Sequence, residues 1–360
     1  MDVKKVAVIG AGNIGTQFGC LCAEKGYSTT MISSGDYGRE VLLETVDERD
    51  RVTHAGKVNF SSDYGVLTEC DVVFVTHPSF MFAELGKRLK DVLRPGTYLC
   101  VLPGTGGAEF FFRDCIKKGV VLCGLQRVPG VARLVEKGKR VRVSGLRDTL
   151  CLASIPAREA EIFAPFLSDL VGIRCETLPQ YLCVTMTPSN PILHTTRLRT
   201  MFFDYEPGRK YDKNPLFYGE WTDRSSALLL LCDAEHQTLL RRMSGLDLSS
   251  VRSLVEHYDK SDTPEKMTKK LRSISSLHGI SSPMIQTSDG WTPDFGSRYF
   301  SADFPYGLAI IEEFAKVVGV ASPNITETMD WYCAVTGKGR TFFLKDFGIT
   351  SLADVYDYYQ

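Results

Sequence analysis

Long hydrophobic runs are missing from this sequence. Its longest aliphatic stretch, from Ala227 to Cys232, is far short of the roughly 20 apolar residues that a membrane-spanning helix needs. We therefore expect no membrane helix and no membrane partner. The chain also passes from Met1 through Lys5 directly into an apolar strand pattern. This leaves no room for a secretory leader, so we expect a cytoplasmic protein.

Net charge and paired cysteines are also lacking. A formal charge of −1 gives no general attraction to nucleic acid, and we expect no such partner. The basic residues Lys139, Arg140 and Arg142 alternate with valines, which is typical of the solvated face of a hairpin. The 11 cysteines include no CxxC pair, and Cys20 and Cys22 are the closest two. This favours buried reduced thiols over disulfides or a metal site, and we expect no metal.

The length and composition are those of a globular protein with two domains. The chain has 360 residues, of which 44% are hydrophobic and 24% charged, and a single core rarely serves so long a chain. Strands and helices alternate at first, and helical patterns dominate beyond Pro179. We predict an α/β domain of the doubly wound Rossmann type over residues 1–180 and an all-helical domain over residues 181–360. The cleft between two such domains is the expected substrate site.

The stretch from Val6 to Gly15 contains the most informative motif. A β-branched run leads into GxGxxG, and a helical pattern follows it. In a dinucleotide site Gly10 permits the tight turn, Gly12 lets the backbone approach a pyrophosphate, and Gly15 lets the helix pack closely on the sheet. Asn13 and Ile14 open the helix whose N–H groups would face the phosphates. A glycine-rich turn without nucleotide is the alternative.

The end of the second predicted strand, Tyr27 to Ser33, indicates which dinucleotide binds. A site specific for NAD usually has an acidic residue here, but this strand ends in Ser33 and Ser34, with Arg39 further on. Hydroxyls and a guanidinium suit a 2′-phosphate, so we favour NADP over NAD. In the alternative interpretation Asp36 caps a helix and these side chains are merely solvated.

Two further strands, Asp71–Thr76 and Thr97–Leu102, end in loops that would reach the ligand edge of the sheet. Thr76 and His77 lie in the first loop, and Pro103 and Gly104 lie in the second. We predict that all four contact the cofactor. We interpret His77 as an ordinary loop histidine in preference to a catalytic one.

Two stretches in the helical half carry residues suited to acid/base chemistry. Asn190 and Pro191 are expected to cap and open a helix, which puts His194 near its start. A histidine there needs an anionic partner to exchange protons near neutral pH. Arg298 offers a planar fork for a carboxylate, and Asp303 could either orient a histidine or favour a helix start. A packed or capping histidine is the alternative for His194.

These two stretches resemble the signature elements of the octopine/nopaline (opine) dehydrogenase family. The first is Asn-Pro-x-x-His, and the second is Arg-Tyr followed by an Asp before Pro-x-Gly-Leu. The resemblance extends to the glycine-rich domain and to the segment from Val128 to Arg133. It departs at Thr195, where the family often has proline, and at Ala302, where it often has an acidic residue.

The resemblance implies a reductive condensation. An amino acid and a 2-oxo acid such as pyruvate would form an imine that accepts hydride from NAD(P)H, with His194 as acid/base, Asp303 as its orienting partner and Arg298 as the carboxylate clamp. The alternatives are a 2-oxo acid reductase of the ketopantoate kind and a non-catalytic cofactor sensor. Substrate identity and oligomeric state are not set by the sequence, and a homodimer is left open.

Overall fold

The computed structural model describes residues 1–35, 37, 40–47 and 52–359. The chain divides into two compact units, Met1–Thr185 and Met186–Gln360, which we call the N-terminal unit and the C-terminal unit. Within the described residues, no helix has the length and apolar character needed to cross a membrane.

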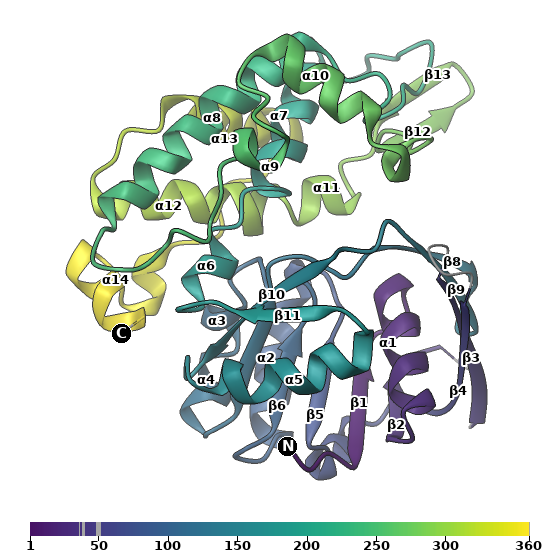
Figure 1. Ribbon diagram of the computed structural model, residues 1–360. Helices are drawn as coiled ribbons and strands as arrows, with labels where there is room; N and C mark the ends of the chain where they lie inside the picture. The colour runs from purple at the N-terminus through teal and green to yellow at the C-terminus, as the bar shows by residue number, and fades with distance from the viewer. Residues whose placement is uncertain (36, 38–39, 48–51, 360) are drawn as a thin grey trace. The chain divides into compact units, whose positions relative to one another are not determined.

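The N-terminal unit is a mixed sheet with helices packed against it (Figure 1). Its described strands have the order β11-β10-β7-β6-β5-β1-β2-β4-β3-β9-β8, in which β5, β1 and β2 pair in parallel. The elements are β1 (Lys5–Ile9), α1 (Asn13–Glu24), β2 (Ser28–Ile32), β3 (Glu40–Asp47), β4 (Val52–Ser61), β5 (Val72–Val75), α2 (Phe82–Val92), β6 (Tyr98–Val101), α3 (Ala108–Phe111), α4 (Arg113–Lys117), β7 (Val121–Leu125), β8 (Val131–Glu136), β9 (Arg140–Ser144), β10 (Thr149–Ile155), α5 (Glu159–Val171), β11 (Arg174–Thr177) and α6 (Leu182–Thr185).

Burial on both faces explains the near-continuous apolar sequence of the central strands. In β1 the residues from Val6 to Ile9 are fully buried, as expected for a parallel strand covered on both sides. Helices α1 and α5 contact each other, and Phe18 and Phe163 from these helices both pack on Phe74 of β5. The predicted α/β fold with a dinucleotide-type sheet is confirmed.

The chain beyond β2 differs from one interpretation of the sequence. A helix capped by Asp36 is wrong for this stretch, because Glu40–Asp47 forms β3 and pairs antiparallel with β4. Asp36 itself lies outside the described residues. The predicted hairpin is confirmed as β8 and β9, in which Val141 and Val143 are buried while Arg140 and Arg142 are exposed.

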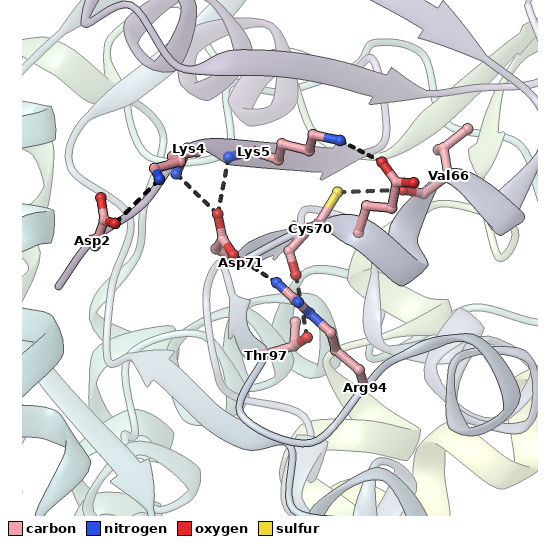
Figure 2. A network of polar contacts seen from close by, with 9 residues as sticks. Asp2, Lys4, Lys5, Val66, Cys70, Asp71, Arg94 and Thr97 are labelled. Atoms are coloured by element: carbon pink, nitrogen blue, oxygen red, sulfur yellow. Dashed lines mark hydrogen bonds and ion pairs between the residues drawn. The ribbon is translucent and has the colours of Figure 1, made fainter.

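Asp71 connects the amino ends of the central strands through hydrogen bonds and an ion pair (Figure 2). Its carboxylate accepts the backbone N–H groups of Lys4 and Lys5 at 2.9 and 3.0 Å and binds Arg94 at 2.7 Å. The Lys5 side chain reaches Glu69 in the same network. This cluster lies at the start of β1, whereas the glycine motif follows its end, so we assign the cluster a structural role.

The C-terminal unit is built mainly of helices. Its elements are α7 (Pro191–Met201), α8 (Asp223–Arg242), α9 (Leu254–His257), α10 (Pro264–Ser273), β12 (Met284–Thr287), β13 (Gly290–Pro293), α11 (Arg298–Ser301), the π-helical turn η4 (Phe304–Leu308), α12 (Ala309–Val318), α13 (Pro323–Thr336) and α14 (Leu352–Tyr359).

The helical character of this unit is confirmed, but an entirely helical unit is not. Strands β12 and β13 form a small antiparallel hairpin. Their sequences are short and only partly buried, so they lack the alternation that identifies a strand. Helix α9 also begins three residues later than the predicted start at Val251, at a capping box formed by Ser253 and Glu256.

Candidate active site

The glycine loop between β1 and α1 fits a dinucleotide phosphate. Gly10 has a φ of +108°, which suits glycine alone among common residues. A Cβ on Gly15 would lie 1.8 Å from the Gly10 carbonyl oxygen, whereas a Cβ on Gly12 would meet nothing within 4 Å. Helix α1 begins without a side-chain cap and without an acidic residue in its first turn. Its free N–H groups and open approach therefore suit an anion.

Asn13 and Ile14 also hold the β8–β9 hairpin. The Asn13 Oδ1 atom accepts the Leu134 N–H at 2.8 Å, and Ile14 packs against the buried hairpin residues Ala132, Val141 and Val143. The predicted cofactor contacts of these two residues would therefore fall to their backbone amides. Those contacts remain a proposal.

The other predicted cofactor loops adjoin the glycine loop or the neighbouring strands. Thr76 donates its hydroxyl to the Ile9 carbonyl at 2.9 Å, and the His77 ring lies where a Cβ on Gly10 would come within 3.0 Å. Burial lowers the pKa of His77, which favours a neutral ring. Gly104 follows Pro103 and accepts the Tyr181 hydroxyl at 3.0 Å.

The serines proposed to select the nucleotide lie at the end of β2. Ser33 is partly buried, and its hydroxyl accepts the Gly35 N–H at 3.2 Å, while Ser34 is exposed. Arg39 lies outside the described residues, so the structure gives no contact for it. The preference for NADP stays a prediction from sequence.

In the C-terminal unit, Pro191 opens α7 as predicted, and His194 lies in the first turn of that helix. The predicted Asn190 side-chain cap is wrong. Asn190 already has helical backbone angles, φ −85° and ψ −47°, and its side chain makes no capping bond. Its carbonyl instead accepts the His194 N–H at 3.1 Å, which fixes the backbone of the first turn.

Close packing of two elements brings the histidine and the aspartate together. A Cβ on Gly307 in η4 would lie only 3.1 Å from the Pro191 ring, so this glycine lets η4 approach the start of α7. Asp303 immediately precedes η4 and does not cap it. Its Oδ2 atom instead lies 2.8 Å from His194 Nδ1. Asp303 therefore pairs with His194 and makes no side-chain cap for η4, while its orienting role is a proposal.

Aromatic side chains enclose the His194 ring. Phe217 and Tyr299 meet it edge to face, at centroid distances of 5.6 and 4.8 Å. The hydroxyl of Tyr218 lies 2.9 Å from the second ring nitrogen, Nε2. His194 is only 5% exposed. Tyr218 was not predicted from the sequence, where its signal is limited to the dense aromatic segment FYGEW from Phe217 to Trp221.

Arg298 begins α11 and is exposed, although the sequence placed it before a helix. Its guanidinium carbon lies 5.5 Å from the centre of the Tyr299 ring, the same ring that contacts His194. Within the described part of the chain, no carboxylate pairs with Arg298. This cation is thus available to an anionic ligand beside the histidine.

Arg197 lies one turn after His194 and is 3% exposed. Its guanidinium donates to the Phe217 carbonyl at 3.1 Å, to the Glu220 carbonyl at 2.8 Å and to the Ser225 hydroxyl at 3.3 Å. Burial lowers its pKa to about 10, so it stays charged at neutral pH. This buried cation fixes the segment that carries Tyr218 to the helix that carries His194.

Two other ionisable groups are buried on α8, Asp233 and His236. Burial raises the pKa of Asp233 to about 6 from 3.8 and lowers that of His236 to about 4 from 6.5. Asp233 also accepts the Leu254 N–H at the start of α9. Between these pH values the folded state holds an extra proton on Asp233 and lacks one on His236, so their effects on stability oppose each other.

We expect the variants Asp233→Asn and His236→Gln to reveal these opposing effects. In Asp233→Asn, the free energy of unfolding should increase as the pH rises from 4 to 6.5, when compared with the unmodified protein. In His236→Gln, the free energy of unfolding should decrease as the pH rises from 4 to 6, in the same comparison. Each change should be on the order of 3 kcal/mol, at about 1.4 kcal/mol per pKa unit. Urea unfolding at several pH values measures both slopes, and two slopes parallel to that of the unmodified protein would contradict the prediction.

Comparison with known families covers both halves of the chain. Residues 6–147 match the ketopantoate reductase PanE/ApbA model, and residues 177–336 match the model of the NAD/NADP octopine/nopaline dehydrogenase alpha-helical domain. Tauropine dehydrogenase of Arabella iricolor is 27% identical over 81% of this chain and 78% of its own length. Octopine dehydrogenase of Mizuhopecten yessoensis is 26% identical over 84% of this chain and 80% of its own.

Solved structures agree on the fold. An octopine dehydrogenase complex with NADH and L-arginine superimposes with a TM-score of 0.83 at 21% identity, covering 98% of both chains. A ketopantoate reductase from Ralstonia eutropha gives a TM-score of 0.61 at 16% identity, over 92% of this chain and 98% of its own. The fold and the site thus define a two-domain dehydrogenase with a nucleotide-binding sheet and a helical domain. Within that class, the helical half of the chain is similar to the octopine/nopaline dehydrogenases.

Proposed function

We propose that this protein is an opine-type dehydrogenase, an NAD(P)-dependent oxidoreductase that acts on CH–NH groups. It joins the amine of an amino acid to a 2-oxo acid through an imine, reduces the imine to a secondary amine, and also catalyses the reverse oxidation. The observation that carries this proposal is the His194–Asp303 pair at 2.8 Å, in a unit that matches the octopine/nopaline dehydrogenase helical domain.

The chemistry divides among the residues described above. NAD(P)H, held at the Gly10–Gly15 loop, supplies the hydride when bound. Arg298 binds the carboxylate of the 2-oxo acid through its planar fork. His194, oriented by Asp303, is the acid/base that serves the oxygen leaving as water when the amine condenses. Ser33, Ser34 and Arg39 favour NADP. The cytoplasmic location and the homodimer stay predictions.

The match to the ketopantoate reductase family model ends at residue 147, before the residues proposed for the acid/base chemistry. The helical half matches the octopine/nopaline model instead. We therefore favour amine-dependent reduction over reduction of a 2-oxo acid alone.

Cofactor oxidation with and without an amine tests the proposed function. NADPH and NADH oxidation is followed with pyruvate and other 2-oxo acids, alone and with a panel of amino acids. The panel includes L-arginine because a solved octopine dehydrogenase binds it. We expect turnover only when both substrates are present, and a secondary-amine dicarboxylate by mass spectrometry. Equal turnover without any amine would refute the opine assignment.

Replacing Arg298 by lysine should chiefly raise the KM for the 2-oxo acid. Lysine keeps the charge but loses the two parallel hydrogen bonds of the guanidinium fork, so we expect a rise of about 10-fold or more, with a smaller change in kcat. The matched control is Arg224→Lys, since Arg224 lies exposed over Phe203 in the same unit. An unchanged KM, or equal loss of cofactor binding, would show that Arg298 is not the clamp.

A further inference from the structure

Both ring nitrogens of His194 are already occupied. Asp303 binds Nδ1 at 2.8 Å, and the Tyr218 hydroxyl binds Nε2 at 2.9 Å. Because Asp303 accepts the Nδ1–H, neutral imidazole presents Nε2 as an acceptor, to which the tyrosine donates. With the ring 5% exposed, neither nitrogen can reach a substrate oxygen unless Tyr218 moves or transmits the proton.

The segment around Tyr218 is held from several sides. Tyr218 is 6% exposed, its ring stacks on Trp221, and its carbonyl accepts the Trp221 N–H at 3.1 Å. Arg197 binds the carbonyls of Phe217 and Glu220 on either side of it. These contacts oppose a displacement of Tyr218, so the second route, transmission of the proton, is favoured.

We propose that the Tyr218 hydroxyl transfers the proton to the oxygen of the 2-oxo acid, and that Asp303, His194 and Tyr218 form one proton relay. This inference rests on the proposed function for the identity of the substrate. Its chemistry requires only an oxygen that takes up a proton, either when it leaves as water in the condensation or when a 2-oxo acid is reduced without an amine.

The relay conserves every proton. When His194 is an imidazolium, its Nε2–H donates to the phenol oxygen, which leaves the phenol O–H free to point at the substrate. That O–H bond breaks as the substrate oxygen takes the proton, while the Nε2 proton moves to the phenol oxygen. Tyr218 ends as a neutral phenol and His194 as a neutral imidazole, and solvent reprotonates the imidazole between turnovers.

The surroundings of the phenol suit this step. Burial keeps the pKa of Tyr218 well above its ordinary value, so the hydroxyl retains its proton at rest. Arg298, the proposed carboxylate clamp, is near enough for its charge to lower that pKa and oppose the effect of burial. The phenol therefore lies within the electrostatic range of the residue that would anchor the 2-oxo acid.

The test is Tyr218→Phe, which removes one hydroxyl and keeps the ring. We expect the single-turnover rate of reduction to fall about 100-fold, within the range of acid/base contributions, with the Kd for NADPH within about 2-fold. A plot of the rate against the fraction of D2O should be curved for the unmodified protein, because two protons move. The same plot should be linear for the variant. A rate within about 3-fold of that of the unmodified protein, or a plot that stays curved in the variant, would overturn the relay.

The matched control is Tyr356→Phe, which also removes a hydrogen-bonded hydroxyl, the one that accepts the Gly245 N–H at 3.1 Å. This variant should leave the rate and the curvature of the plot unchanged. If the unmodified protein reduces a 2-oxo acid without amine, the opine assignment fails, yet the same isotope measurement still tests the relay.

A second measurement needs no turnover. With 15N-labelled histidine, Tyr218→Phe should shift the Nε2 resonance of His194 and leave the other five histidines in place, since the sequence has six. The absence of any shift at Nε2 would overturn the relay, whatever reaction the protein performs.

Discussion

Replacing Asp303 by asparagine is expected to lower the single-turnover rate of reduction about 100- to 10,000-fold, while the Kd for NADPH changes little. The carboxylate accepts the Nδ1–H of His194 at 2.8 Å and stabilises the ring when it becomes charged. An asparagine amide has no charge, and it can instead donate to Nδ1 and favour the wrong tautomer. The loss should therefore approach that of removing the acid/base itself.

Stopped-flow measurements on Asp303→Asn, His194→Gln and the double variant test this expectation. If the two residues act as one unit, the double variant should be hardly slower than either single variant. Asp330→Asn is the matched control, because Asp330 binds Arg340 elsewhere in the C-terminal unit. A rate for Asp303→Asn within about 3-fold of the unmodified protein would remove Asp303 from the mechanism.

The second large effect is expected at Gly15. In Gly15→Ala the new Cβ would lie 1.8 Å from the Gly10 carbonyl oxygen, and a backbone atom of a buried strand end cannot move aside cheaply. Helix α1 must then shift from the sheet, and we expect a loss of at least about 2 kcal/mol in the free energy of unfolding. Urea unfolding without cofactor measures this loss.

Gly12→Ala separates packing from ligand approach. Its Cβ would meet no atom within 4 Å, so the stability of the protein without cofactor should change by less than about 1 kcal/mol. The same methyl would stand where a pyrophosphate approaches the backbone, so the Kd for NADPH should rise about 10-fold or more. If both variants lose stability equally, the space around these glycines has been misassigned.

The parts of this protein that the sequence predicted are those with local signals. The β1–α1 turn follows from an apolar run and three glycines, and the His194 and Arg298 elements are short motifs in which spacing is informative. The β12–β13 hairpin was missed because its strands are short and only partly buried. Asn190 precedes α7 as predicted but makes no side-chain capping bond, because the preference of a residue type does not fix its backbone angles.

Tyr218 could not be predicted for a different reason. Its place beside His194 depends on Arg197, a cation buried against two backbone carbonyls rather than a carboxylate. Composition normally indicates that an arginine is exposed or paired with an acid. Only the tertiary structure shows a charged side chain that fixes a loop, so this hydrogen-bond partner of the proposed acid/base could not be read from the sequence.

The division of the chain into two units has a consequence for how its residues can be substituted. Asp303, His194, Tyr218 and the residues that hold them all belong to Met186–Gln360, while the nucleotide loop belongs to Met1–Thr185. The proton machinery is therefore modular. We therefore expect substitutions at the end of β2 to leave the contacts among Asp303, His194 and Tyr218 unchanged.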